Sequence, residues 1–480
     1  MKHLTTFLFC LCVIPWISSC AINPVTGRTE LMLLSDQDEV RMGQETDPEI
    51  TAMYGIYDDV ALVTYIDNLG QQLAKISHRP QLTYTFNVMD SPVINAFAVP
   101  GGYVYLTRGI LAYLNSEAEL AGIIGHEIGH ITARHSAQQY TKAQLAQIGL
   151  GLGSLLSQTF SQYAGLAGQG IGLLFLKFSR DNEREADSLG VEYSSKAGYD
   201  ATDMANFFIT LDKMHGGEKG SLPDFLTTHP NPENRVGAVR EAARKWQATL
   251  GLTSPKINRN TYLRRIDGLV VGDDPSQGFV ENSIFYHPGM KFTFPVPRGW
   301  ELQNLPSQVQ IISPDEKASI LFTLGTTTTP EAEAQSFLTE SKATVLSRKD
   351  TVINGFKTLM LMSQLPTQSG TLQIVSSFIS NNRTVFIFHG FTGELNFTAY
   401  QKAFQETMNG FRTLRDQAKL NVRQDRIRIR QTTRTMSLSQ ALTQFGTPHA
   451  DLEKLALING RNLSDQIPAN TLLKVIEKGR

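Results

Sequence analysis

The sequence His126-Glu127-Ile128-Gly129-His130 decides the class of fold, because it predicts a metal site built on a helix. At positions i and i+4, the two imidazoles project from one helix face, one turn apart, where both can reach one ion. Glu127 lies beside that face and is expected to act as general base, taking the proton of a zinc-activated water that attacks a peptide carbonyl. The motif therefore predicts one Zn²⁺ per chain and peptide hydrolysis.

The residues around the motif favour this interpretation over a helix with two solvated surface histidines. The flanking residues 120–124 are apolar, as are Ile128 and Ile131, and buried imidazoles need a partner. Ser116, followed three residues later by Glu119, forms a capping box that predicts the start of the helix.

The third ligand distinguishes the classes of zinc peptidase that share this motif. The metzincin spacing requires a glycine three residues and a histidine six residues after His130, where this chain has Ala133 and Ser136. His135 is one position out of register and is expected on the helix surface. A thiolate ligand is excluded, because the three cysteines all lie in the N-terminal segment, at Cys10, Cys12 and Cys20.

Two carboxylates downstream are candidates for the remaining roles. Residues 178–187 open a second helix, on which Glu183 and Asp187 share one face at i and i+4. One carboxylate there can complete the zinc shell, and the other can accept the free N–H of a histidine ligand and fix its tautomer. Without the upstream motif, a solvated acidic helix face would be the ordinary interpretation.

The pairing of His-Glu-x-x-His with Glu-x-Glu-Ala-Asp resembles the gluzincin metallopeptidase family that contains HtpX, Oma-type and CAAX-prenyl proteases. The resemblance spans about residues 23–255 and is closest to the periplasmic BepA-like branch, although the chain shows no 34-residue tetratricopeptide repeat. It implies that Glu183 is the third zinc ligand and that Asp187 is the partner of a histidine ligand. Glu185, between them, would face away.

The resemblance also implies roles for two other segments. Residues 95–104 match the strand that precedes the zinc helix, so Gly102, Tyr103 and Val104 are expected in an exposed edge strand that takes the substrate backbone by β-augmentation. Residues 228–235 match a downstream His-Pro segment, in which His229 would approach the metal-bound water or stabilise the developing negative charge. A simple helix-entry turn is the alternative for that segment.

The N-terminus predicts a bacterial lipoprotein. Lys2 precedes an apolar run, residues 7–17, that is too short to span a bilayer. The run leads into Ile-Ser-Ser-Cys at residues 17–20, which resembles the lipoprotein signal box, so Cys20 would become the lipid-modified N-terminus. An ordinary secretory signal is the alternative. Ala21, rather than Asp, at the next position implies the outer membrane, with the chain facing the periplasm.

Length and charge predict several domains and exclude some partners. The chain has 480 residues, with 44 basic against 45 acidic side chains, so it has no overall attraction to nucleic acid. After a signal peptide at residues 1–20, we expect a mainly α zincin-type peptidase domain with a small β-sheet at residues 21–262. A linker at 263–283, an α+β domain at 284–418 and a small α/β module at 419–480 would follow.

The accessory regions suggest further hypotheses. Residues 292–300 resemble the opening strand and turn of PsbP-like domains. The last sixty residues resemble the LysM carbohydrate-binding module, which would make peptidoglycan a partner, but they lack its Gly-Asp-Thr turn. The glycine-rich residues 146–178 would form either a movable cover over the cleft or a buried helical hairpin, and polar interruptions exclude a transmembrane span there.

Taken together, these patterns predict a lipid-anchored zinc endopeptidase that cleaves periplasmic or outer-membrane proteins, with protein quality control as the role that the resemblance implies. The alternative is an envelope assembly or chaperone-like factor whose peptidase site is regulated or rarely used.

Overall fold

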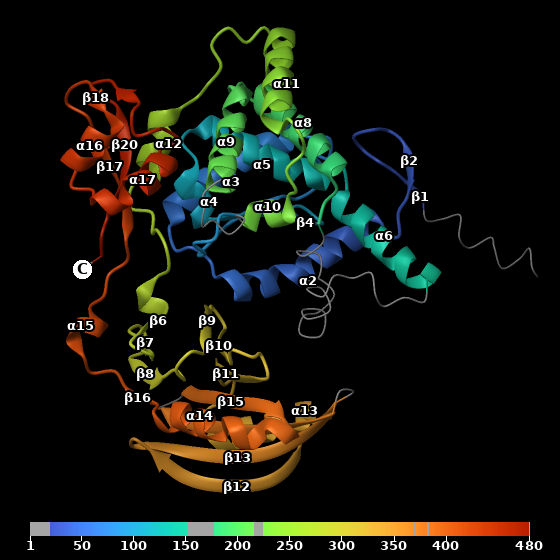
Figure 1. The fold of residues 1–480 in the computed structure, drawn as a ribbon. Helices are drawn as coiled ribbons and strands as arrows, with labels where there is room; N and C mark the ends of the chain where they lie inside the picture. The colour runs from blue at the N-terminus through green and yellow to red at the C-terminus, as the bar shows by residue number, and fades with distance from the viewer. Residues whose placement is uncertain (1–19, 151–176, 216–223, 368–369, 382–383, 480) are drawn as a thin grey trace, which may run out of the picture. The chain divides into compact units, whose positions relative to one another are not determined.

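The structure is a computed structural model that describes residues 20–150, 177–215, 224–367, 370–381 and 384–479 (Figure 1). It contains two compact units. The first comprises Met1–Thr51, Gly55–Gly272 and Arg426–Glu477, and the second comprises Ala52–Tyr54, Asp273–Asp425 and Lys478–Arg480. The second unit is thus inserted in the sequence of the first.

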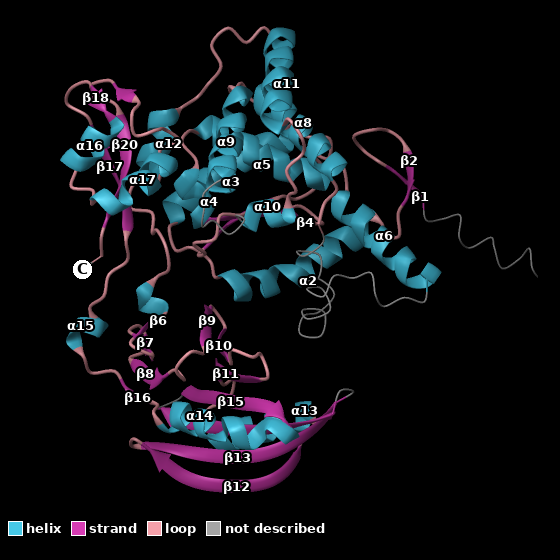
Figure 2. Ribbon diagram, in the orientation of Figure 1, coloured by secondary structure: helices cyan, strands magenta, loops and turns pink. Residues whose placement is uncertain are grey.

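Helices dominate the first unit between a short hairpin and the insertion (Figure 2). The hairpin pairs β1 (Cys20–Ile22) with β2 (Thr29–Leu31). The helices are α2 (Asp36–Tyr54), α3 (Val60–Lys75), α4 (Arg108–Tyr113), α5 (Glu117–Thr132), α6 (His135–Leu150), α8 (Arg180–Lys196), α9 (Met204–His215), α10 (Asp224–Thr228), α11 (Arg235–Leu250) and α12 (Arg259–Arg265). Within the described ranges, no helix combines the length and the apolar character needed to cross a bilayer.

A three-stranded sheet packs beside these helices. Its order is β3 (Thr85–Met89), β5 (Tyr103–Thr107), β4 (Ala96–Val99), with β5 parallel to β3 and antiparallel to β4. The expectation that Gly102, Tyr103 and Val104 form an exposed edge strand is therefore wrong, because β5 is the central strand and is paired on both sides. The edge on the hairpin side is β4.

Small residues let α5 and α8 approach closely. A Cβ atom at Gly190 of α8 would lie 2.9 Å from the backbone nitrogen of His126, and one at Gly125 would lie 3.0 Å from the Gly190 carbonyl oxygen. Every residue of α5 is buried. Because the two backbones nearly touch here, side chains one turn away on each helix are brought face to face.

The start of α5 differs from the expected capping box in one bond. The Ser116 hydroxyl accepts from the Glu119 backbone N–H, as expected. The Glu119 carboxylate, however, accepts from the backbone N–H of Asn115 rather than that of Ser116. The Ser116 hydroxyl also donates to Asp203, so this helix start is tied to the turn that precedes α9.

The C-terminal module belongs to the first unit. It contains β17 (Arg426–Gln431), β18 (Met436–Ser437), α16 (Leu438–Gln444), α17 (Leu452–Ile458), β19 (Gln466–Ile467) and β20 (Leu472–Glu477), and Figure 1 shows it beside α12. Ile427 exchanges backbone hydrogen bonds with Gly268 and Leu269. Residues 263–270, expected as the start of a linker, therefore contribute to the core, with Leu269 and Val270 buried. The LysM-like identity of the module stays a prediction.

The second unit is built on a seven-stranded antiparallel sheet. Its order is β12 (Thr344–Ile353), β13 (Phe356–Thr367), β14 (Gly370–Asn381), β15 (Thr384–Gly393), β11 (Ala318–Leu324), β10 (Gln308–Ile312), β9 (Glu301–Leu305). Phe386 and Phe388 pack on α14 (Phe397–Asn409), whereas Val385 and Ile387 pack on α13 (Pro330–Ser341). Because alternate strand residues point to opposite faces, the two helices cover opposite faces of the sheet.

A smaller sheet completes the second unit, with the order β16 (Arg412–Thr413), β8 (Phe292–Pro295), β7 (Ile284–His287), β6 (Phe279–Glu281). This mixture of helices with antiparallel sheets agrees with the expected α+β class. In the glycine-rich segment expected at residues 146–178, α6 extends to Leu150 and residues 151–176 lie outside the described residues. The lid hypothesis therefore stays a prediction.

Candidate metal centre

The zinc-motif residues project from the second half of α5 into the core. His126, Glu127 and His130 are at most 1% exposed. The Nε2 atoms of the two histidines lie 3.0 Å apart, so both rings point to one place. This is the arrangement that the i, i+4 spacing predicts for two ligands of one ion.

The helix α8 places two carboxylates against these rings. The Oε2 atom of Glu183 lies 3.5 Å from His126 Nε2, and its Oε1 atom lies 3.5 Å from His130 Nε2. On the other side of the same ring, Asp187 Oδ1 lies 2.9 Å from His126 Nδ1. Glu183 is thus placed to bind the same ion as the histidines, and Asp187 to orient one of them.

His229 joins the same cluster. It follows α10, stacks on Phe225 with ring centroids 4.5 Å apart, and is fully buried. Its Nδ1 atom lies 3.1 Å from Glu183 Oε1 and 3.3 Å from His126 Nε2. His126, His130, Glu183 and His229 each offer a ligand atom within 4.8 Å of the others. The geometry therefore makes His229 a candidate fourth ligand, a role that the sequence did not indicate.

Buried atoms without hydrogen bonds lie beside the cluster. Neither carboxylate oxygen of Glu127 has a hydrogen-bond partner among the described residues, and the same holds for His229 Nε2, which lies 3.8 Å from Glu127 Oε1. Leaving such groups unpaired in the core is costly. A set of imidazole nitrogens and carboxylate oxygens suits Zn²⁺, and several other divalent transition metals accept it as well.

Arg235, the first residue of α11, donates hydrogen bonds to the carboxylates of Glu183 and Asp187 on α8. Its Nε and Nη2 atoms donate to the two oxygens of Asp187, at 2.8 Å each, and Nη2 also donates to Glu183 at 3.3 Å. The guanidinium lies 3.8 Å from the ring centroid of Phe208. Sequence analysis did not single out Arg235, although it ends the segment 228–235 that carries His229.

Burial and neighbouring charges shift the pKa values of the carboxyl groups in and around the cluster in opposite directions. Burial alone would raise the pKa of Asp187, but Arg235 and His126 outweigh it and hold the pKa of this carboxyl below its usual range. Burial likewise opposes ionisation of Glu183, yet His229 outweighs it and lowers the pKa. For Glu127, burial is the largest influence and raises the pKa. These surroundings thus favour the ionised form of Glu183 and the protonated form of Glu127.

The prediction that His135 lies on the helix surface is wrong. His135 is fully buried, and its Nδ1 atom lies 2.9 Å from His130 Nδ1. The reason is that α5 ends at Thr132 and the chain turns before α6, so His135 does not continue the expected helix face. Glu185 lies outside the metal cluster, and its Oε2 atom is 3.1 Å from His135 Nε2.

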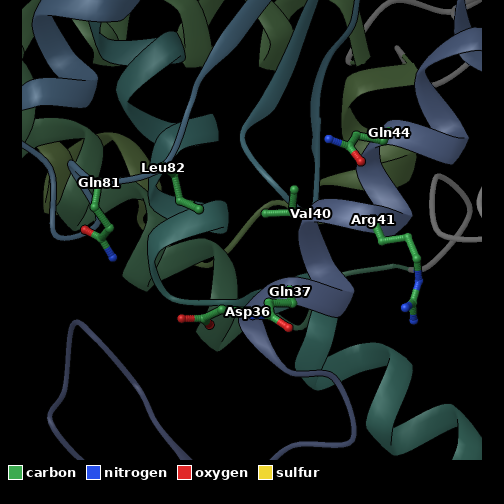
Figure 3. Close-up of a pocket in the computed structure, with 7 residues that line it drawn as sticks. All are labelled: Asp36, Gln37, Val40, Arg41, Gln44, Gln81 and Leu82. Carbon is green, nitrogen blue, oxygen red and sulfur yellow. The ribbon is translucent and has the colours of Figure 1, made fainter.

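The hollow shown in Figure 3 belongs to another part of the first unit. It is lined by residues of α2 and of the loop before β3: Asp36, Gln37, Val40, Arg41, Gln44, Gln81 and Leu82. None of these side chains belongs to the metal cluster.

The fold and this site have the arrangement that is expected of a zincin-type metallopeptidase domain. The model of a known family, peptidase family M48, matches residues 62–243. Over these residues, the chain is similar to members of peptidase family M48.

Known relatives support this similarity. The beta-barrel assembly-enhancing protease of Yersinia pestis is 32% identical over 270 residues, covering 53% of this chain and 53% of that protein. The protein of the same name from Escherichia coli K12 is 32% identical over 231 residues, covering 46% and 47%. Mitochondrial metalloendopeptidase OMA1 of Schizosaccharomyces pombe is 31% identical over 226 residues, covering 45% and 65%. The chain thus spans about half the length of the first two relatives.

The similarity to solved structures is weak. Cyanobacterial PsbP (CyanoP) from Synechocystis sp. PCC 6803 is 11% identical, with a TM-score of 0.24, covering 28% of this chain and 96% of that one. A score this low carries no argument about fold. The PsbP-like resemblance of residues 284–418 stays a prediction.

Proposed function

We propose that this chain is a zinc-dependent endopeptidase of the cell envelope that hydrolyses peptide bonds in envelope proteins. The observation that carries the proposal is the buried cluster of His126, His130 and Glu183, with the Glu127 carboxylate, which accepts no hydrogen bond from the described residues, beside it. When bound, zinc lowers the pKa of a water molecule and polarises a peptide carbonyl.

The protein's own residues then have distinct roles. His126, His130 and Glu183 hold the metal, and Glu127 receives the proton of the attacking water. Asp187 keeps the His126 ring in the orientation that presents its Nε2 atom to the metal.

Substitution of Glu127 by Gln tests the chemistry. The amide that replaces the carboxylate cannot accept the proton, so cleavage of an unfolded protein substrate should fall by about 10²- to 10⁴-fold. Zinc content and melting temperature should stay near those of the parent protein. Glu192→Gln makes the same change on α8, where the carboxylate pairs with Lys196 instead of facing the cluster, and it should leave cleavage intact. Undiminished cleavage by the Glu127→Gln variant would refute the assigned base.

Removal and return of the metal test the cofactor. Dialysis against a chelator should abolish cleavage, and one equivalent of Zn²⁺ per chain should restore it. Elemental analysis of the purified protein identifies the ion that it carries. A protein that keeps its activity with less than about a tenth of an equivalent of any transition metal would exclude a metallopeptidase mechanism.

A second candidate function has support from His229. Catalytic zinc sites keep one position open, whereas closed four-ligand sites are structural. With His229 among the candidate ligands, the cluster offers four protein groups, which favours an envelope assembly or chaperone-like factor whose peptidase site is regulated.

His229→Ala separates these interpretations of the residue. If His229 closes the site, cleavage should rise, and if it stabilises the transition state, cleavage should fall. In a deletion strain, the Glu127→Gln variant separates the two functions. Rescue of every deletion phenotype by that variant would show that peptide hydrolysis is not the main role.

The proposed location rests on Cys20. A lipid on its sulfur would anchor the chain at the outer membrane, so that the first unit faces the periplasm. Cys20→Ser should move the protein from the membrane fraction to the soluble fraction. The names of the relatives point to β-barrel assembly, which makes outer-membrane barrel proteins the first substrates to test in a quality-control role. A variant that stays on the membrane would refute lipid anchoring.

Peptidoglycan is a proposed partner through residues 419–480. The module is packed into the first unit, so the full chain, rather than the isolated module, should be tested for co-sedimentation with peptidoglycan. Binding that disappears on truncation after residue 425 would support the proposal only if the truncated chain still binds zinc. An absence of co-sedimentation would refute it.

A further inference from the structure

Each histidine of the zinc motif has a second group on the ring nitrogen that faces away from the metal. For His126, the group is Asp187, whose Oδ1 atom lies 2.9 Å from Nδ1. For His130, the group is His135, with the two Nδ1 atoms 2.9 Å apart. Beyond His135, the Oε2 atom of Glu185 lies 3.1 Å from Nε2. The contacts of His130 therefore form a chain, His130–His135–Glu185, that runs from the cluster towards the surface.

The direction of the hydrogen bonds in this chain is fixed by chemistry. A neutral His130 that offers Nε2 to a metal carries its proton on Nδ1. That proton can be donated only to a lone pair, so His135 must be unprotonated at Nδ1 and must carry its own proton on Nε2. The carboxylate of Glu185 accepts a hydrogen bond from this Nε2–H group. The chain permits one tautomer at each ring, and that tautomer presents His130 Nε2 to the cluster.

We propose that His135, supported by Glu185, is a positioning residue that holds His130 in the tautomer and orientation required for metal binding. This inference rests on the metal site of the proposed function. It assigns to α6 a role in the site that the His-Glu-x-x-His motif does not contain.

The backbone before His135 is shaped to bring its ring back to His130. After α5 ends at Thr132, Arg134 adopts a φ of 60°, in the left-handed region that non-glycine residues avoid. This turn redirects the chain so that α6 starts at His135. A conformation of this kind persists only where its surroundings determine it.

Those surroundings are a cluster of four charged residues, here called the clamp: Asp36 and Glu39 at the start of α2, with Arg79 and Arg134. The Arg134 guanidinium contacts Glu39 Oε1 at 3.3 Å and Asp36 Oδ1 at 3.3 Å, and donates to the Leu34 carbonyl oxygen at 2.8 Å. Arg79 pairs with the same two carboxylates, at 2.9 Å and 3.2 Å, and also donates to the Ile131 carbonyl oxygen. Asp36, at the edge of the hollow in Figure 3, is the exposed member of the clamp.

The environment of the chain protects its hydrogen bonds from water. His135 is fully buried, and the Phe178 ring stacks on His130 with centroids 4.0 Å apart. Glu185, with its side chain 30% exposed, is the member that reaches solvent. In such a buried site, water cannot replace the hydrogen-bond acceptor that His135 provides. Loss of this acceptor should therefore weaken metal binding.

Three substitutions test the role of His135 through zinc affinity, measured by competition with a chelator on the metal-free protein. His135→Leu removes the acceptor and should weaken zinc binding by about 10- to 100-fold. His135→Asn keeps an acceptor near the position of Nδ1 and should recover most of the affinity. Glu185→Leu alters a partly exposed residue and should weaken zinc binding several-fold.

The control distinguishes positioning from packing. His78 bonds Tyr193 through its Nδ1 atom, at 2.7 Å, and lies outside the cluster, so His78→Leu should leave zinc affinity unchanged. Melting of the metal-free proteins reports folding: a packing role would lower the melting temperature of both His135 variants without separating their zinc affinities. Equal zinc affinity of the parent, His135→Leu and Glu185→Leu proteins would overturn this inference alone. A parent protein that binds no zinc would overturn the proposed function as well.

Discussion

The side-chain ammonium of Lys474 donates to the carbonyl oxygen of Leu114 at 2.7 Å, across 360 residues of sequence. It also donates to the carbonyl oxygen of Ala112 at 2.8 Å, and Lys474 is fully buried. Both carbonyls lie at the C-terminal end of α4, just before α5 begins. Burial lowers the pKa of Lys474 well below its ordinary value, and burial of Glu119 in the first turn of α5 raises the pKa of that carboxyl to about 8. A residue of β20 thus supports the start of the helix that carries His126 and His130.

Lys474→Met should destabilise the first unit. The two carbonyl oxygens lose their donor, at about 1–3 kcal/mol each, while removal of a buried cation offsets part of that cost. We expect a net loss of about 2 kcal/mol in the free energy of unfolding, measured by thermal or urea denaturation. Lys454→Met, at an exposed position of α17, is the matched control. Equal stability of the two variants would contradict the inference that the Lys474 hydrogen bonds stabilise the first unit.

Gly190→Ala should weaken zinc binding without touching a ligand. The new Cβ atom would lie 2.9 Å from the His126 backbone nitrogen and 3.0 Å from the Gly122 carbonyl oxygen, so α5 and α8 must separate. Zinc affinity should fall by roughly tenfold or more, a fall typical of disturbed ligand geometry. In the control Gly237→Ala, the Cβ atom meets only the Asn234 side chain, which can move away. Similar zinc affinities for the two variants would show that the close helix contact does not position the ligands.

Arg235→Lys should weaken zinc binding even though it keeps the charge. The guanidinium bonds both oxygens of Asp187 and reaches Glu183, and an ammonium cannot reproduce that fork. We expect zinc affinity to fall by about 10- to 100-fold in a chelator competition. In the control Arg240→Lys, further along α11, the parent arginine bonds the Asn206 side chain, and the change should have no effect. A parent-like affinity for the Arg235→Lys variant would argue that charge alone matters there.

The stability of the second unit should depend on pH through His389. Burial lowers the pKa of its imidazole to about 4, while its Nδ1 atom lies 2.8 Å from the Ser376 hydroxyl. Because the folded-state pKa lies below the unfolded value, the stabilisation is complete above about pH 6.5 and is lost as the pH falls towards 4. The ring keeps partial exposure, so the loss should be at most about 3 kcal/mol.

His389→Gln should flatten this dependence, measured as the free energy of unfolding at about pH 7 and about pH 4.5. Lys402→Gln, on α14 of the same unit, changes a group that does not titrate in this window and should preserve the slope. A His389→Gln variant with the parent slope would assign the dependence to other groups.

The sequence predicted the helix of the zinc motif and the acidic helix, because each carries a strong local pattern. The Ser116 cap and the pair of Glu183 and Asp187 each involve residues no more than four positions apart. Relations at this short range can be recognised from the pattern of a single sequence. The sequence predicted a small sheet in this domain, but not the order of its strands. The parallel pairing that makes β5 central joins segments far apart in the sequence, and local patterns do not encode it.

The missed parts of the site depend on contacts between distant segments. His135 was assigned to the surface because the helix was assumed to continue, and an arginine in a left-handed turn is not a recognised stop signal. The left-handed conformation of Arg134 depends on its contact with Glu39, 95 residues earlier. The roles of Arg235 and Lys474 were missed for the same reason, since a charged residue is expected in solvent unless its partners are known.

The interleaving of the two units affects the order in which the chain can fold. On a ribosome, residues 55–272 emerge before the inserted second unit, and β20, which supplies Lys474, emerges after both. The inserted unit can fold as it appears, whereas α5 gains the contacts of Lys474 only once β20 has emerged. A nascent or truncated chain without β20 would therefore contain every proposed zinc ligand while the start of α5 still lacked the support of Lys474.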